Sequence, residues 1–246
     1  MTSIKTADSA KVTTVVQSVW QLSGFEKPML GIVPLNELIG AYPIWFAEIP
    51  YLSPRQAKIF LAKKMGQTPI LDFNSDENLS GFLFAQQNRS VFTGCIFVDA
   101  NDILARRRFS AAHELGHYLL HFLPAMQELA AAGKEEVMAT EGLIYETSND
   151  AEGSGTNNEW AGKQIVIPGL EIAENVMLFT ESWQEAEANQ FAAELLMPTE
   201  TCQTLIAQHQ VPFGRKREFL ANRLSSELLV SREAITWRLA SLGIGG

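Results

Sequence analysis

The stretch RFSAAHELGHYLLH, residues 108–121, holds three of the four histidines in a chain of 246 residues. His113 and His117 are four residues apart, so on a helix their side chains point the same way, one turn apart. Glu114 completes an HExxH pattern, in which two imidazoles bind one metal ion and a carboxylate takes a proton from the bound water. The stretch predicts a helix with two metal ligands, His113 and His117, and a catalytic acid/base, Glu114. The alternative is a set of partly buried histidines that are held only by hydrogen bonds.

The remaining histidines do not fit as the third ligand. His121 lies eight residues after His113, which corresponds to about 12 Å of helical rise. Two nitrogens on one zinc ion can be at most about 4.2 Å apart. His121 is therefore expected to support or pack against the site. A metzincin pattern is excluded, because Leu120 and Leu123 stand where it needs glycine and histidine. His209 has no acidic pattern around it and is disfavoured.

A second helix, predicted over 182–198, offers acidic candidates for the third ligand. Glu185 borders a face of this helix that carries Ala188, Ala192 and Leu195 and is expected to be buried. Glu187 lies about 200° around the helix from Glu185 and is expected to face water. Glu194, in a more apolar stretch, is a weaker candidate. The pattern favours Glu185 without excluding the other two.

Two further residues are expected to serve the first helix. Asn189, one turn after Glu185, can hydrogen-bond an imidazole that binds the metal. Gly116 lies inside the helix that carries the histidines, where glycine costs about 1 kcal/mol relative to alanine. A helix tolerates that cost where another backbone packs close, so we expect a second element against Gly116.

The elements around these helices follow from local patterns. Residues 79–86 and 90–99 are rich in aromatic and β-branched residues and predict an antiparallel hairpin, which could offer a free edge to an extended substrate. The histidine helix is predicted over about 102–123, capped by Asp102 and closed before Pro124. The first fifty residues are expected to form short elements broken by prolines.

Further boundaries complete the predicted organisation. A helix is expected from Pro54, with Ser53 as its cap and Gly66 beyond its end, and another over about 125–141. Residues 145–160 predict a flexible acidic loop, and 163–179 a short strand with turns. We divide the chain into an N-terminal segment, 1–60, a catalytic domain, 61–200, with an insert at about 123–181, and a helical tail, 201–246.

Composition and charge limit the functional classes. Apolar residues make up 46% of the chain, which is enough for a real core. The net charge of −9 argues against a large nucleic-acid interface. Cys95 and Cys202 are isolated and are expected to be reduced and at least partly buried. The N-terminus lacks the pattern of a secretory signal and no apolar run could cross a membrane, so a soluble cytoplasmic protein is expected.

At the level of motifs, the sequence resembles a known family. RFSAAHELGHYLLH, followed by EAEANQFAAELLMP, is similar to the ImmA/IrrE-type zinc metallopeptidases of bacteria and their mobile elements. The lead-in GCIFVDANDILARRRF, a strand and a turn before the helix, is also similar. The resemblance covers about 79–122 and 182–198 closely.

The resemblance implies an α+β, gluzincin-like (zincin) domain in which a small antiparallel sheet packs on the active-site helices. It implies Zn²⁺ bound by His113, His117 and Glu185, with Glu114 as acid/base. Members of the family typically cleave a transcriptional repressor in the cytoplasm, which releases genes for stress responses or element transfer. The implied activity is that of a zinc endopeptidase acting on a repressor or an antitoxin-like regulator. The long insert departs from compact members and leaves the shape of the substrate cleft open.

Two other functional classes are compatible with the residues. One is a catalytically weak protein that binds a partner through the same cleft. The other is a DNA-binding regulator, because LANRLSSELLVSREAITWRLASLG in the tail has a helix-turn-helix look, with Ser231 capping its second helix. Arg232, Thr236 and Arg238 would then lie toward the DNA groove. We favour a packing or docking role for this tail. A further donor for the oxyanion is expected but not identified. Tyr118 and Tyr145 are candidates, although each is expected to be structural.

Overall fold

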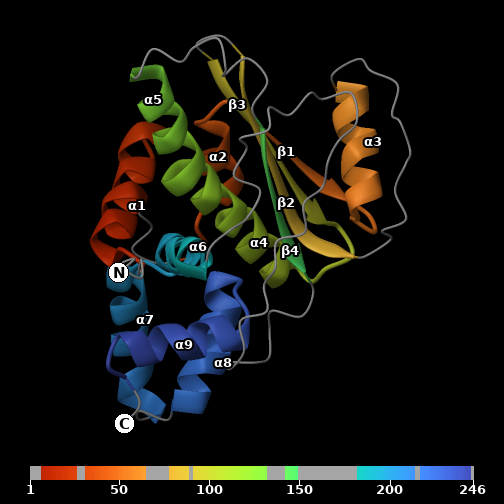
Figure 1. Ribbon diagram of the computed structural model, residues 1–246. Coiled ribbons are helices and arrows are strands. Elements are labelled where there is room, and N and C mark those ends of the chain that lie inside the picture. The colour runs from red at the N-terminus through yellow and green to blue at the C-terminus, as the bar shows by residue number, and fades with distance from the viewer. Residues whose placement is uncertain are drawn as a thin grey trace.

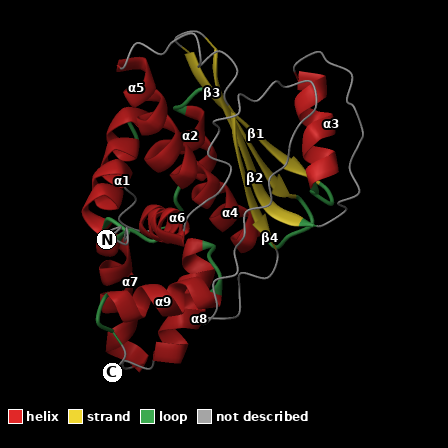
Figure 2. Cartoon of the chain, in the orientation of Figure 1, coloured by secondary structure: helices red, strands yellow, loops and turns green. Residues whose placement is uncertain are grey.

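The chain folds as a mixed α+β protein in which a sheet separates helix α3 from a larger group of helices (Figures 1 and 2). The computed structural model describes residues 7–26, 31–64, 78–88, 91–131, 142–148, 182–213 and 217–244. The elements are, in chain order, α1 (Ser9–Ser23), α2 (Leu35–Gly40), β1 (Ile44–Ile49), α3 (Pro54–Lys64), β2 (Leu79–Asn88), β3 (Val91–Asp99), α4 (Leu104–His117), the π-helix η1 (Tyr118–Phe122), α5 (Leu123–Ala131), β4 (Gly142–Ser148), α6 (Ser182–Leu196), α7 (Thr199–Phe213), α8 (Arg217–Leu228) and α9 (Arg232–Ser241).

The sheet has four strands in the order β1-β3-β2-β4. Strands β2 and β3 pair antiparallel, as the hairpin prediction expects, and β4 pairs antiparallel with β2. Strand β1 pairs parallel with β3, so the sheet is mixed and the expectation of an antiparallel sheet is wrong at this edge. The two hairpin strands both lie inside the sheet, so the expectation that they offer a free edge is also wrong. Within the described residues, the outer strands are β1 and β4.

Alternation along the strands produces a separate apolar core on each face of the sheet. Phe82 and Phe97 face α3, where their rings stack with centroids 5.8 Å apart. Leu83 and Ile96 face the other way and join the larger core with the helices. This larger core extends from α1 through α4 and α6 to α9. The histidine helix is therefore packed between the sheet and other helices.

The histidine helix is longer than its sequence predicts. It begins after Ile103 rather than after Asp102, and Ile103 makes no side-chain cap. It also continues through Pro124 into α5. The π-helix η1 lies directly before that proline, and the Leu123 N–H bonds to the Tyr118 carbonyl five residues earlier. Proline lacks an N–H and clashes with the carbonyl four residues before it, and the wider π turn precedes the position where that occurs.

The first fifty residues contain a long helix that the sequence interpretation missed. Helix α1 begins at an Asp8 cap, whose carboxylate accepts from two backbone N–H groups of the first turn. Val12, Val16 and Val19 recur at helical spacing and are buried. Helix α1 packs against α6 (Figure 1), so the N-terminal segment contributes to the main core.

Several predicted boundaries fall at the edge of the described residues. Helix α3 begins after Ser53, whose hydroxyl accepts from the Gln56 N–H at 3.3 Å, as expected. Residues 145–148 belong to strand β4, so the predicted loop does not begin at 145. The rest of that loop and the predicted strand at 163–179 lie outside the described residues, as do residues 132–141 of the helix predicted over 125–141.

The tail forms helices α7, α8 and α9 below the sheet (Figure 1). The Ser231 hydroxyl accepts from the Ala234 N–H at 3.0 Å, so the predicted cap of α9 is confirmed. Ile235 and Leu239 point inward and are fully buried. Arg238 donates to the Met197 carbonyl at the end of α6, which ties the tail to the helix that carries Glu185. None of the helices in the described part of the chain could cross a bilayer.

Candidate metal centre

The two histidines of the HExxH pattern lie on the face of α4 that meets α6. His113 is 3% exposed and His117 is fully buried. Their Nε2 atoms are 3.0 Å apart. The close approach of the two helices depends on Gly116, because an added Cβ would lie 3.0 Å from the Phe191 ring and 3.3 Å from the Ala188 backbone. The expectation that another backbone packs against this glycine is confirmed.

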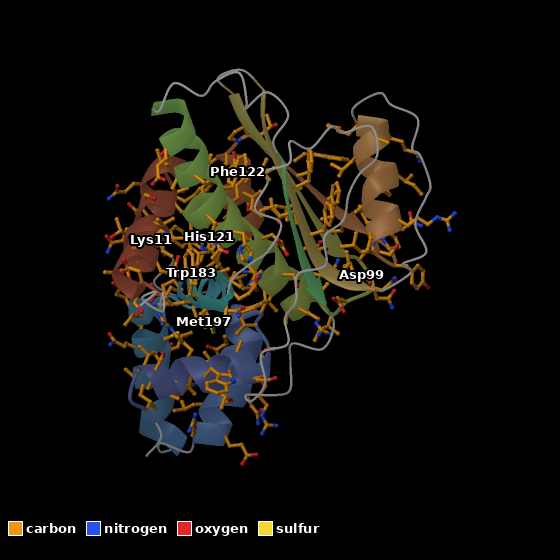
Figure 3. The ribbon with its side chains drawn as sticks, viewed as in Figure 1. Lys11, Asp99, His121, Phe122, Trp183 and Met197 are labelled. Carbon is orange, nitrogen blue, oxygen red and sulfur yellow. The ribbon has the colours of Figure 1, made fainter. Side chains whose placement is uncertain are left out.

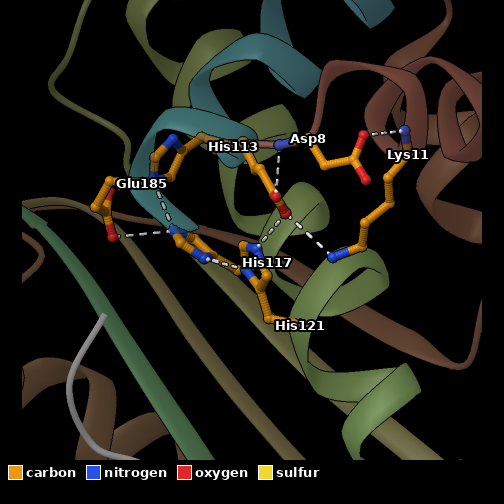
Figure 4. A network of polar contacts seen from close by, with 7 residues as sticks. Asp8, Lys11, His113, His117, His121 and Glu185 are labelled. Carbon is orange, nitrogen blue, oxygen red and sulfur yellow. Dashed lines mark hydrogen bonds and ion pairs between the residues drawn. The ribbon is translucent and has the colours of Figure 1, made fainter. Parts of the chain in front are cut away.

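Glu185 of α6 brings a carboxylate to the same point (Figure 4). Its Oε2 lies 3.3 Å from His113 Nε2, and its Oε1 lies 3.3 Å from His117 Nε2. Its side chain keeps 21% of its surface exposed, so the group is reached from outside on this side. His113, His117 and Glu185 together form a group that could hold a metal ion.

The spacing of these atoms fits a small tetrahedral metal ion. Ligand atoms about 2.1 Å from zinc at tetrahedral angles lie about 3.4 Å from one another. The three separations here are 3.0, 3.3 and 3.3 Å. Two imidazole nitrogens and a carboxylate all present lone pairs, and this set repels itself unless a proton or a cation lies between its members. The donor set is therefore complementary to a divalent cation.

Electrostatics favour the protonation states that such an ion needs at Glu185 and His117, but not at His113. Burial lowers the pKa of His117 to about 4, although the hydrogen bond with Glu185 partly offsets this. Burial also disfavours the charged form of His113, but the hydrogen bond and charge of Glu185 outweigh it and raise the pKa of His113. Burial opposes ionisation of Glu185, but its polar contacts with the two imidazoles hold its pKa well below the usual range. A metal ion would thus meet an anionic carboxylate and a neutral His117, and would displace a proton held at His113.

Asn189 supports the first imidazole. Its side-chain Oδ1 lies 3.0 Å from His113 Nδ1. An amide oxygen only accepts, so His113 Nδ1 carries the hydrogen and Nε2 is left to face the metal position. The expectation that Asn189 hydrogen-bonds an imidazole of the site is confirmed.

Glu114 lies beside the two histidines and against the sheet. It is fully buried, and its charge acts on His113. A Cβ added to Gly81 of β2 would come within 2.6 Å of Glu114 Oε1. The strand therefore leaves room for this carboxylate only because residue 81 is glycine.

His121 contacts the site without entering it. Its Nδ1 lies 3.0 Å from His117 Nδ1, on the side of that ring away from Glu185. Its Nε2 lies 3.2 Å from Glu187 Oε2. His121 thus supports the site rather than joining the group at Glu185, as the rise of the helix predicts.

Glu187 corrects a prediction from the sequence. It was expected to face water, yet it is 2% exposed. Lys11 donates to Glu187 Oε2 at 3.1 Å, and the Asp8 N–H donates to Glu187 Oε1 at 3.0 Å. The face of α6 that carries Glu187 is covered by α1, the helix that the sequence interpretation missed. Figure 3 shows Lys11, His121 and Trp183 gathered where α1, the histidine helix and α6 meet.

The other candidates lie elsewhere or serve packing. His209 Nε2 pairs with Glu227 at 2.9 Å within the tail. Glu194 accepts from the Thr13 hydroxyl of α1. Tyr118 is fully buried, with its ring stacked on Phe122, in agreement with a structural role. The side chain of Tyr145 lies outside what the structure describes.

An α+β chain with an HExxH helix and a converging carboxylate has the features of a metallopeptidase-type domain. Residues 71–142 match the family Peptidase_M78, described as IrrE N-terminal-like domain. The match includes His113, Glu114 and His117 and ends before Glu185. It confirms, over this segment, the resemblance to the ImmA/IrrE metallopeptidases. The family suggests a peptidase, and a peptidase implies a protein substrate. No curated protein matches this chain.

Proposed function

We propose that this protein is a zinc-dependent endopeptidase with a zincin-like catalytic domain, spanning about 61–200. The observation that carries the proposal is the convergence of His113, His117 and Glu185 from two helices, at separations of 3.0–3.3 Å, beside Glu114. Two histidines and one carboxylate are the ligand set of several zinc peptidases, which keep a fourth position open for water. The 21% exposure of Glu185 is consistent with access from that side.

In this proposal each residue has a separate task. His113, His117 and Glu185 hold the metal, and Asn189 orients His113. A zinc ion held there would lower the pKa of a bound water toward about 7 and would polarise the peptide carbonyl. The Glu114 carboxylate accepts the proton of the attacking water and returns it to the leaving amine. The burial of Glu114 strengthens its interaction with charge that develops in the transition state.

The proposed substrate is a cytoplasmic regulator, either a transcriptional repressor or an antitoxin-like protein. This part of the proposal is supported by the family resemblance and by the match over residues 71–142. The net charge of −9 favours a protein partner over nucleic acid.

We further propose that the tail, 201–246, has a packing or docking role although it resembles a helix-turn-helix. Arg238 is engaged with the Met197 carbonyl and the Thr199 hydroxyl, at 3.0 Å each. Arg232 pairs with Glu218 at 3.0 Å. Two of the residues that a DNA reader would present are therefore occupied by contacts within the chain.

The test is an assay of the zinc-loaded protein with candidate repressors, in which cleavage is followed by mass spectrometry of the products. The parent should cleave one defined bond. Glu114→Gln should retain the metal but lose cleavage, because this carboxylate is not a ligand. A protein that binds a repressor tightly without cutting it would instead be a partner-binding regulator. Equal cleavage by Glu114→Gln would contradict the assigned acid/base.

A further inference from the structure

A chain of polar contacts runs from His117 to the start of α1 (Figure 4). His117 Nδ1 lies 3.0 Å from His121 Nδ1, and His121 Nε2 lies 3.2 Å from Glu187 Oε2. The same carboxylate oxygen accepts from Lys11 Nζ at 3.1 Å, while Oε1 accepts from the Asp8 N–H at 3.0 Å. The chain therefore links a residue of the metal centre to the N-terminal helix through two buried side chains.

The donor and acceptor of each contact in this series follow from the Glu187 carboxylate at its end. A carboxylate oxygen only accepts, so His121 Nε2 carries a hydrogen and donates it to Glu187. A neutral imidazole has one N–H, so His121 Nδ1 is an acceptor. The contact between the two Nδ1 atoms then requires that His117 Nδ1 be the donor. His117 is left with a bare Nε2, and that lone pair faces Glu185 and His113.

We propose that His121 and Glu187 are positioning residues, which hold His117 in the tautomer that presents Nε2 to the metal, and that Lys11 and the first turn of α1 hold Glu187 in place. This inference rests on the proposed function, since it assigns His117 as a ligand. It deepens that function by making the N-terminal helix part of the support of the metal centre.

Burial holds the hydrogen bonds of His121 and Glu187 in one arrangement. The side chains of His121 and Glu187 are each 2% exposed, so water does not compete for their contacts. The His121 ring also meets the Trp183 ring edge to face, with centroids 5.6 Å apart, which restricts its rotation. Partners of metal-bound imidazoles commonly fix ring orientation and raise ligand basicity.

The test compares His121→Leu with His121→Asn in the full chain. Leucine has nearly the volume of histidine but no acceptor, whereas the asparagine Oδ1 can accept at the position of Nδ1. In the metal-free protein, ¹⁵N–¹H spectra of the imidazoles should show His117 with its hydrogen on Nδ1 in the parent and in His121→Asn. His121→Leu should populate the other tautomer and weaken zinc binding by about 10- to 100-fold in competition with a chelator. His121→Asn should restore most of that affinity.

A second pair of variants, Glu187→Gln and Glu194→Gln, tests the inference if His121→Leu does not fold. Glu187→Gln replaces one accepting oxygen by a donor, so at least one of its three N–H partners loses its acceptor. We expect a loss of zinc affinity of about 10-fold, the lower end of the range. Glu194→Gln is the matched control, because Glu194 also joins α6 to α1 but contacts no histidine in the structure. Its zinc affinity should equal that of the parent.

Two results would overturn the inference. One is a His117 that keeps its hydrogen on Nδ1 in His121→Leu. The other is an equal loss of zinc affinity in the leucine and asparagine variants, or in Glu187→Gln and Glu194→Gln, which would indicate packing alone. The tautomer is measured without metal or substrate. If the parent bound no zinc or cleaved nothing, the proposed function would be refuted. The spectra of the metal-free protein would still show whether His121 sets the tautomer of His117.

Discussion

Gly81 of β2 lies directly against Glu114 of α4, so closely that a single added methyl group would come within 2.6 Å of the carboxylate. Strand β2 thus fits against α4 because residue 81 has no side chain where it meets Glu114, the residue proposed to transfer the proton. We expect Gly81→Ala to displace Glu114 and reduce peptidase activity strongly while zinc is retained at one ion per chain. Gly81 faces no metal ligand in the contacts described. Unchanged cleavage by a correctly folded Gly81→Ala would show that the position of Glu114 is not critical.

Replacing Glu185 by alanine should mainly affect zinc binding, whereas replacing Glu187 by alanine should mainly affect thermal stability. Glu185→Ala removes a proposed ligand with 21% of its side chain exposed, so zinc should be lost, and the variant should unfold near the temperature of the metal-free parent. Glu187→Ala leaves the buried His121 without its acceptor, which costs about 1–3 kcal/mol. Lys11 is 35% exposed, so its charge can turn to water and adds little. The second variant should therefore unfold at a clearly lower temperature. Metal content and thermal unfolding of both proteins provide the check, and the reverse order of zinc loss would contradict the ligand assignment.

The tail offers a prediction about contacts and DNA. Arg238→Met should lower the stability of the chain by about 1.5–3 kcal/mol, because it removes hydrogen bonds from a charged group. Arg232→Ala is the control, since its exposed pair with Glu218 contributes only about 0–1 kcal/mol. Denaturant unfolding measures both.

The parent should show no salt-dependent binding to duplex DNA at physiological salt. Tight binding abolished by Arg232→Ala would instead assign the tail to DNA recognition.

The two cysteines should react slowly with thiol reagents. Burial raises the pKa of both thiols to about 11, so little thiolate is present at pH 8. Cys202 is fully buried, whereas Cys95 is partly exposed. Alkylation followed by mass spectrometry should modify Cys95 before Cys202, and both more slowly than in the unfolded chain. Rapid modification of Cys202 would mean that the core beneath α7 opens readily.

The sequence predicts the elements whose signals are local. The spacing of His113 and His117, the cap of α9 and the hairpin all follow from short patterns, and the structure contains each of them. Gly116 also carries a local signal, since glycine in a helix interior indicates close packing. The face of α6 that holds Glu185 follows from the spacing of its alanines.

Features that depend on distant segments could not be read in this way. Helix α1 is rich in valine and threonine, which have low helix propensity, so its local helix signal is weak although Val12, Val16 and Val19 have helical spacing. Without α1, the opposite face of α6 looks solvated, so the sequence of α6 alone predicts that Glu187 faces water. The parallel pairing of β1 likewise depends on a strand that no local signal joins to the hairpin. The contact of Gly81 with Glu114 exists only in the folded chain.

The central claim is that two helices hold one metal ion through His113, His117 and Glu185. X-ray absorption at the zinc edge of the purified, zinc-loaded protein tests it most directly. We predict one zinc per chain with two imidazole nitrogens and oxygen ligands, all at about 2.0–2.2 Å, and no sulfur. Glu185→Ala should lose zinc under the same conditions. A chain that retains no zinc, or a shell that contains a third imidazole or a thiolate, would contradict the claim.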